Sequence, residues 1–473
     1  MTAPVTDTRL IAAFRFGTGL PLPPGAPETP AAMHAALSGP DTAAAAFPAP
    51  RTTEVLIATA TAFEARRASR KPGEGATMAA DGMMDGGGMG GGGMGGEKEA
   101  RAVIDTLRLD GARAQIARAL DAHDGFRERL VRFWADHFTV RNRLGLDAAL
   151  PGAFVEDAIR PNIGGRFADL LRAATLHPAM LAYLDQVSSV GPNSLLGLRR
   201  GRGLNENLAR ELIELHTLGV GAPYTQQDVR ELAALLTGLG VDGFSGTVFR
   251  PTWAEPGDET VLGTTYGGAG MEPIDAVLAD LAVRPETADH IARKLAVHFV
   301  ADDPDPGLVA DLAAVFRDTG GDLPSVHRAL AEHPDAWAAP LTKMRQPLDY
   351  LVAALRALGV TGAEVAALPR GPMRRHVILP MSRMGQPWQA PRGPDGWPEG
   401  ADAWVTPQLL AARIEWALET PKRLVPDLPE PVDLARRALG PLAAGRVEWA
   451  AARAETRGEG VALVLAARAF QWR

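Results

Sequence analysis

The spacing of apolar residues constrains this chain more than any other feature. In residues 97–185, apolar side chains recur at positions i, i+3 and i+4, and Gly, Pro and Asn separate the runs. That spacing places apolar groups on one face of a helix, and the intervening residues end helices. Similar patterns occupy residues 275–282, 285–300, 306–318, 323–333, 345–358 and 407–419. The sequence therefore predicts a mainly α fold built as a large multi-helix array.

Two regions depart from the helical pattern. In residues 240–270, Gly-rich polar turns alternate with Val and Phe, which predicts a small β-hairpin excursion. Residues 379–404 are rich in loop-forming residues and contain three of the chain's tryptophans, Trp388, Trp397 and Trp404. We expect a single large helical domain over residues 1–473, in which 360–473 form a loop-rich C-terminal subregion packed on the same body.

Residues 71–96 include the Met- and Gly-rich run MMDGGGMGGGGMGG. Such a run has too little apolar surface to bury, so we predict a disordered surface insertion. Its thioether sulfurs are soft ligands that suit Cu(I). Copper handling by Met83, Met84, Met89 and Met94 is therefore one alternative function.

Composition excludes several classes of protein. The 473 residues are 46% hydrophobic and 22% charged, as in ordinary globular proteins. A net charge of -7 gives no general attraction to nucleic acid. The absence of Cys excludes disulfides, thiolate nucleophiles and cysteine metal sites.

The sequence also bears on location. No run approaches the roughly 18 apolar residues that span a bilayer, so we expect no membrane span. The first residues lack the basic and apolar regions of a secretory signal. We expect a cytoplasmic protein, or one exported together with a signal-bearing partner.

The densest cluster of ionisable groups lies in NENLARELIELHTLG, residues 205–219. Asn205 is a favourable N-cap and Gly219 a favourable terminator, so we predict one amphipathic helix between them. At about 100° per residue, its polar side carries Glu206, Arg210, Glu211 and Glu214. Its apolar side carries His216 among leucines.

This polar side has two interpretations. Glu206 and Glu214 each lie four residues from Arg210. This is the spacing of ion pairs on a solvent-exposed helix face. Alternatively, other elements cover the face, and its carboxylates form a buried network or an active-site wall. In an enzyme, one carboxylate would act as general base while Arg210 holds an anionic group.

Two histidines fall on apolar helix faces. His216 does so in the helix just described, and His137 follows Phe133 along FRERLVRFWADHF. A histidine in that position is usually a hydrogen-bonded core residue, but these two with nearby carboxylates would complete a metal site. There is no HExxH motif, phosphate loop, serine-hydrolase motif or dinucleotide fingerprint. A hydrolase or metal-dependent enzyme using these residues is the other alternative function.

Six blocks of the chain, in order, resemble the bacterial family called domain of unknown function 1800. They are LVRFWADHFTV, LHPAMLAYLDQ, GLNENLARELIELHTLGVGAPYTQQDVRELAALLTG, ARKLAVHFV, KMRQPLDYLVAALRALG and MGQPWQAPRGPDGWP. The resemblance implies a largely helical fold, and the family brings no settled activity with it. In the longest block, Thr225 and Asp228 have the spacing of a capping box.

The resemblance also suggests a partner. Members of this family are often encoded beside a second family, domain of unknown function 1501, which resembles sulfatases and alkaline phosphatases. Our main expectation is therefore an accessory or binding protein that partners, matures or escorts a sulfatase-like neighbour.

This chain departs from the family pattern in the predicted hairpin region. Relatives usually have a His-Asp pair before a Gly and a Lys, where this chain has Ala254, Glu255, Gly257 and Glu259. Leu239 replaces the usual Trp. The resemblance therefore transfers no chemistry from that pair to this protein.

Overall fold

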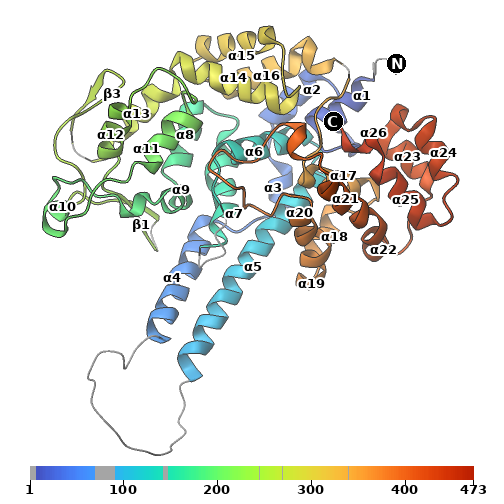
Figure 1. The fold of residues 1–473 in the computed structure, drawn as a ribbon, viewed down its shortest axis with the longest axis horizontal. Helices are drawn as coiled ribbons and strands as arrows, with labels where there is room; N and C mark the ends of the chain where they lie inside the picture. The colour runs from blue at the N-terminus through green and yellow to red at the C-terminus, as the bar shows by residue number, and fades with distance from the viewer. Residues whose placement is uncertain (1–6, 70–90, 142–146, 244–245, 269, 339) are drawn as a thin grey trace, which may run out of the picture.

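The structure is a computed structural model that describes residues 7–69, 91–141, 147–243, 246–268, 270–338 and 340–473. It is mainly α, as the apolar spacing predicts (Figure 1). Among the described helices, none is both long and apolar enough to cross a membrane.

The first half of the chain contains twelve labelled α-helices. They are α1 (Thr8–Ile11), α2 (Pro30–Ser38), α3 (Thr42–Ala46), α4 (Thr52–Ser69), α5 (Gly91–Asp121), α6 (Gly125–His137), α7 (Leu150–Phe154), α8 (Phe167–Thr175), α9 (Pro178–Tyr183), α10 (Leu195–Arg200), α11 (Asn207–Glu211) and α12 (Gln226–Leu235). Short π-helical segments extend four elements of the fold, namely η1 (Ala12–Phe16), η2 (Val155–Ile159), η5 (Leu212–His216) and η7 (Met373–Ile378).

The second half continues with α13 to α26. They are α13 (Glu272–Ala282), α14 (Pro285–Phe299), α15 (Pro306–Asp318), α16 (Leu323–Glu332), α17 (Pro347–Ala357), α18 (Gly362–Ala367), α19 (Arg370–Pro372), α20 (Leu379–Arg383), α21 (Pro407–Glu419), α22 (Pro421–Leu424), α23 (Pro431–Leu439), α24 (Arg446–Ala451), α25 (Arg457–Ala466) and α26 (Arg468–Gln471). Short 3-10 turns connect several of them.

Two antiparallel hairpins interrupt the helices. β1 (Leu239–Asp242) pairs with β2 (Gly246–Phe249), and β3 (Glu259–Val261) pairs with β4 (Thr264–Tyr266). They lie where the Gly-rich turns of the sequence predict a small β excursion. Next to them, Thr225 and Asp228 form the predicted capping box at the start of α12.

Helices α4 and α5 lie side by side and project away from the other helices (Figure 1). Helix α5 begins at Gly91, inside the stretch predicted to be a disordered insertion, so that prediction extended six residues too far. A Cβ on Gly96 would meet Ala65 of α4 at 3.9 Å, which shows that this end of α5 runs beside α4. Residues 71–90 of the predicted insertion lie outside the described residues.

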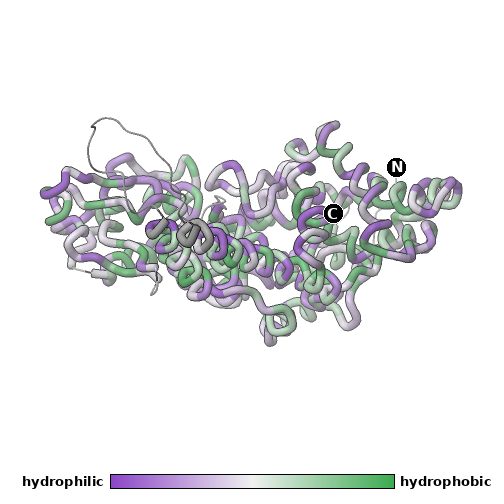
Figure 2. Tube along the Cα trace, turned by 90° about the horizontal axis from the view of Figure 1, so that it is seen from below, coloured by the Kyte–Doolittle hydropathy of each residue, from purple (hydrophilic) through white to green (hydrophobic). Residues whose placement is uncertain are grey.

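The buried residues form two hydrophobic clusters. The larger joins the helices from η1 to α16, and the other joins α1, the second half of α5 and the helices from α17 to α26. Helix α5 contributes Ile104 to the first cluster and Ile116 to the second. Hydrophobic and hydrophilic residues alternate along the helices in both regions (Figure 2). The division of the chain into a main body and a C-terminal subregion stays a prediction, but α5 packs into both clusters.

Candidate functional site

The predicted helix over residues 205–219 changes geometry halfway. Asn205 Oδ1 accepts the Asn207 N–H at 2.9 Å, and regular α-helix ends at Glu211. From Leu212 the chain is π-helical, and the Thr217 hydroxyl closes this turn by donating to the Leu212 carbonyl at 2.6 Å. A π turn holds more residues than an α turn, so side chains after Glu211 point elsewhere than a uniform α-helix predicts.

The polar side of this helix lies partly in solvent. Arg210 binds Glu206 at 3.0 Å and Glu214 at 3.2 Å, and the three side chains are 37%, 30% and 21% exposed. Ion pairs of this exposure contribute about 0.2–1 kcal/mol each. Glu211 beside them is half-buried, and burial followed by the Glu214 charge raises its pKa. Glu206 and Arg210 therefore belong to the surface, whereas Glu214 turns toward a cavity.

That cavity, which we call the histidine cavity, has a volume of about 460 Å³. Its lining includes Phe133, Asp136, His137, Glu214, Leu215, Val220, His290, Arg293, Lys294, Val297, Asp395, Trp397, Pro398 and Glu399. It thus brings together two of the predicted site residues, His137 and Glu214. His216 is buried behind the wall, its ring 6.2 Å from that of His137.

The ring nitrogens of His137 and His290 contact backbone carbonyl groups. His137 Nε2 lies 3.1 Å from the carbonyl of His216, and His290 Nε2 lies 3.1 Å from the carbonyl of Leu215. Burial lowers the pKa of His216 to about 3 and that of His290 to about 4, so both rings are neutral at pH 7. Within the described parts of the chain, no three His, Asp or Glu side chains are grouped as a metal site requires.

The side chains of the four methionines that are predicted to handle copper lie outside what the structure describes. Met83, Met84 and Met89 lie outside the described residues. Met94 lies in α5, but its side chain is also outside what the structure describes. Copper handling stays a prediction.

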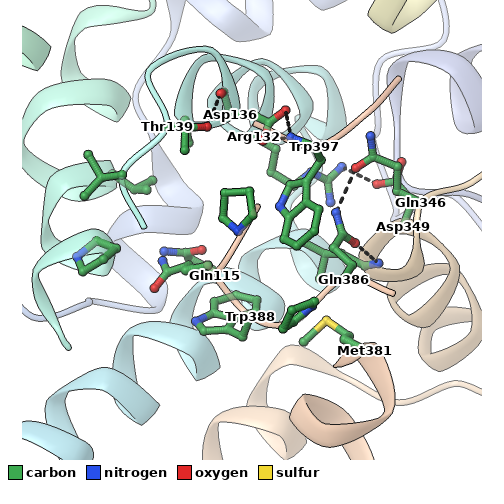
Figure 3. Close-up of a pocket in the computed structure, with 18 of the residues that line it drawn as sticks. Gln115, Arg132, Asp136, Thr139, Gln346, Asp349, Met381, Gln386, Trp388 and Trp397 are labelled. Atoms are coloured by element: carbon green, nitrogen blue, oxygen red, sulfur yellow. Dashed lines mark hydrogen bonds and ion pairs between the residues drawn. The ribbon is translucent and has the colours of Figure 1, made fainter. Parts of the chain in front are cut away.

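A second cavity, which we call the donor pocket, lies between α5, α6, α7 and the segments that surround α17 and α20 (Figure 3). Its volume is about 130 Å³, roughly ten times what one ordered water needs. The indole of Trp397 reaches toward the centre of the pocket, opposite Trp388 and Met381. Residues as far apart in the sequence as Gln115 and Trp397, which are 282 positions apart, meet here.

Several residues that line the donor pocket carry buried N–H groups that make no hydrogen bond within the described residues, although Arg132 Nη2 lies 3.4 Å from Asp349. Within the described residues, Arg132 Nη1 and Nη2, Gln115 Nε2 and Trp388 Nε1 are buried and make no hydrogen bond. An unsatisfied buried donor costs about 1–3 kcal/mol, more when charged, so native structures contain few. All four atoms belong to residues that line this pocket.

Positive charge exceeds negative charge around Asp349. Its carboxylate lies 3.0 Å from Arg129, 3.4 Å from Arg132 and 3.2 Å from Arg473. Burial alone would raise the pKa of Asp349, but these guanidinium groups overcome it and hold its pKa below the usual range. Three buried or half-buried guanidinium groups thus share one carboxylate. Of the three, Arg132 lies farthest from it, at 3.4 Å.

The donor pocket is also lined by a residue with a buried hydrogen-bond acceptor, His298. His298 lines the donor pocket, and its Nδ1 lies 2.5 Å from Glu399 Oε1. Burial lowers the pKa of His298 to about 4, although Glu399 opposes the shift, so the ring is neutral and Nδ1–H donates to Glu399. His298 Nε2 is then a buried lone pair without a partner among the described residues.

The loop between α20 and the C-terminal helices covers the donor pocket. Gln386 fixes one end, since its Oε1 accepts the Leu348 N–H at 2.8 Å and its Nε2 donates to Gln346 at 2.9 Å. Gln389 in the same loop has φ 49°, a left-handed conformation that a non-glycine residue rarely adopts. Such backbone strain persists where the surrounding structure enforces it, and it concentrates at functional sites.

Asp136 and Trp397 form the wall between the two cavities, since both residues line each of them. Burial raises the pKa of Asp136 to about 7, with further contributions from Glu399 and Asp395. At neutral pH this carboxyl group is therefore present in both protonation states. It is the one acid in the donor pocket wall that is suited to exchange protons there.

Sequence reasoning missed the donor pocket, although one signal for it was present. Arg129, Arg132 and Asp136 are spaced i, i+3 and i+7, so they share one face of a helix whose other residues are largely apolar. Several other lining residues come from the KMRQPLDY and MGQPWQAPRGPDGWP blocks, about 210 and 250 positions further along. No local pattern indicates that these three segments meet.

The chain was also compared with known proteins. No curated protein and no solved structure matches it. A family model described as "Protein of unknown function (DUF1800)" matches residues 25–472, which include every residue that lines the two cavities. Since this match covers nearly the whole chain, the protein belongs to the DUF1800 family.

Proposed function

We propose that this protein binds a small carboxylic acid in the donor pocket. The observation that carries the proposal is the set of buried N–H groups on Arg132, Gln115 and Trp388 that make no hydrogen bond within the described part of the chain. A carboxylate offers two oxygens to the planar guanidinium fork, and such bidentate pairs are among the strongest hydrogen-bonded contacts in proteins.

Charge favours the same ligand. Burial, with a smaller contribution from Arg129, lowers the pKa of Arg132, and Asp349 offsets this only in part. A guanidinium nevertheless stays protonated in proteins, so Arg132 remains a cation that lacks a full counter-charge. An incoming carboxylate would supply that charge inside a cavity where solvent screening is weak.

The other side chains that line the donor pocket indicate the chemistry of the rest of the ligand. Trp388, Trp397 and Met381 present apolar surface, which fits an aromatic or aliphatic body. The lone pair of His298 Nε2 fits one hydroxyl donor on that body. The best match is therefore a compact hydroxy acid with an apolar group.

Calorimetric titration with mandelate tests the proposal, because mandelate combines a phenyl ring, a hydroxyl and a carboxylate. We expect mandelate to bind, and the uncharged mandelamide to bind at least about tenfold more weakly. Arg132→Gln should abolish mandelate binding. Arg383→Gln is the matched control, because Arg383 is 68% exposed and its ion-pair partner on the surface is Glu415. Equal binding by Arg132→Gln and the unmodified protein would refute the assignment of the pocket.

A ligand-binding role accords with the accessory or binding function expected from the sequence. The partnership with a sulfatase-like neighbour stays a separate proposal, supported by the family resemblance. A pull-down from native extract in the presence of mandelate tests it, and recovery of no sulfatase-like protein would count against it.

A further inference from the structure

Two lysines near the histidine cavity have opposite environments. Lys343 is 1% exposed, and its Nζ lies 2.6 Å from Asp302, 3.1 Å from Glu399 Oε2 and 2.8 Å from the Glu399 carbonyl. Lys294 lines the cavity on α14, and within the described residues its Nζ has neither an ion pair nor a hydrogen bond. The chain contains only five lysines, Lys71, Lys98, Lys294, Lys343 and Lys422, among 49 basic residues.

The groups that face Lys294 come from several elements. They are Asp136 and His137 of α6, Glu214 of η5, His290 and Arg293 of α14, and Asp395 and Glu399 of the loop before α21. Three of these acids act on Lys294 electrostatically, Asp136 most strongly, yet none approaches within ion-pair distance. Burial nevertheless lowers the pKa of Lys294. The side chain is thus held among acids without being neutralised by any one of them.

An arginine would suit this position if only a positive charge were needed, and arginine is the usual buried cation of this protein. Lysine differs in that it can lose its proton and become a nucleophile. The cavity of about 460 Å³ gives a small molecule access to Nζ. Asp136, which titrates near pH 7, lies in the same wall as a proton donor and acceptor.

We infer that Lys294 forms an imine with a small aldehyde or ketone bound in the histidine cavity. The Nζ of the free amine adds to the carbonyl carbon, and the C–O bond then breaks as water leaves, giving Lys–N=CHR from Lys–NH2 and O=CHR. On addition, one proton passes from nitrogen to the carbonyl oxygen, and protonated Asp136 supplies the second proton with which that oxygen leaves as water. Asp136 then regains its proton from the remaining N–H. This inference concerns a different cavity from the acid-binding pocket and does not rest on it.

The charged side chains that line the histidine cavity restrict which carbonyl compounds it can bind. Four acids line it, Asp136, Glu214, Asp395 and Glu399, against Lys294 and Arg293. An acidic aldehyde would meet these carboxylates at close range, whereas a neutral one would not. The ligand class is therefore a neutral carbonyl compound such as a short sugar.

Reductive trapping tests the inference on the full chain. The protein is incubated with glyceraldehyde and cyanoborohydride at pH 7, and all lysine peptides are quantified by mass spectrometry. We expect Lys294 to be labelled about tenfold or more above Lys422, which is half exposed on the surface, because burial lowers the pKa of Lys294 and so raises its free-amine fraction. Glyoxylate, an acidic aldehyde, should label Lys294 less than glyceraldehyde does.

Lys343 is the internal control, since it is 1% exposed and ion-paired with both Asp302 and Glu399. Labelling of Lys294 no greater than that of Lys422, or equal labelling of Lys294 and Lys343, would overturn the inference. Asp136→Asn tests the acid separately. It should slow labelling of Lys294 about tenfold and leave Lys422 unchanged, and an unchanged rate at Lys294 would remove Asp136 from the mechanism.

Discussion

Asp136 and Trp397 are 261 residues apart, yet both carboxylate oxygens of Asp136 accept the Trp397 backbone N–H, at 3.0 and 3.2 Å. This contact fastens the loop that covers the donor pocket to α6. It also completes the wall that separates the donor pocket from the histidine cavity. The integrity of both cavities therefore depends on one long-range contact.

Gly396 permits that contact. Its φ is +83°, and a Cβ there would lie 2.7 Å from the Asp136 carbonyl oxygen and 2.8 Å from Oδ1. We expect Gly396→Ala to weaken mandelate binding at least about tenfold and to reduce the free energy of unfolding by about 1–3 kcal/mol. Calorimetry and urea denaturation measure these two effects. Gly371→Ala, at an exposed glycine with no atom within 4 Å of the added Cβ, should change neither.

Asp349 is the shared counter-charge of three arginines. Asp349→Asn removes its charge and leaves those cations buried without compensation, which typically costs about 3–5 kcal/mol. We expect a loss of that size in urea denaturation. Glu415→Gln disrupts an ion pair whose side chains are 68% and 62% exposed, and it should cost less than about 1 kcal/mol. Similar losses for the two variants would contradict the role assigned to Asp349.

Thr217 stabilises the π turn that directs Glu214 toward the histidine cavity. Thr217→Val keeps the shape of the side chain but leaves the Leu212 carbonyl without this buried hydrogen bond. The expected cost is about 1–3 kcal/mol in the free energy of unfolding. Thr61→Val removes the same kind of bond, to the Ile57 carbonyl, from an exposed position of α4. Its cost should be below about 0.5 kcal/mol, and an equal cost in both variants would argue against a special role for the π turn.

His327 makes stability depend on pH. It is fully buried, and burial lowers its pKa from 6.5 to about 3. Below pH 6.5 the unfolded chain takes up a proton at this site that the folded protein does not, so stability falls as pH falls from about 6.5 to about 3. One such group contributes at most about 1.4 kcal/mol per pH unit.

The variant His327→Gln tests this contribution, because glutamine retains an acceptor for the Trp134 indole N–H, which bonds His327 Nε2 at 3.3 Å. Between pH 7 and pH 5, the variant should lose about 2 kcal/mol less stability than the unmodified protein. Urea denaturation at the two pH values measures the difference. Identical losses would show that His327 is protonated in the folded state.

The sequence by itself determined the helices, the position of the hairpins and several helix ends. These features depend on neighbours in the chain. Apolar spacing selects the face that each helix buries, and the Thr225–Asp228 capping box closes between residues three apart. The prediction failed locally at Leu212–His216, where the chain is π-helical and the Thr217 hydroxyl donates to the Leu212 carbonyl.

Only the tertiary structure decided where the candidate site lies. The helix that carries the densest charges proved to be partly exposed, and among its charged residues Glu214 lines the histidine cavity. The donor pocket instead joins α6 to segments more than 200 residues away. Whether a polar group finds a partner depends on which helix faces pack together. That choice minimises the free energy of the whole core, so no local pattern shows that Arg132 lacks a full counter-charge or that Lys294 lacks an ion pair among the residues the structure describes.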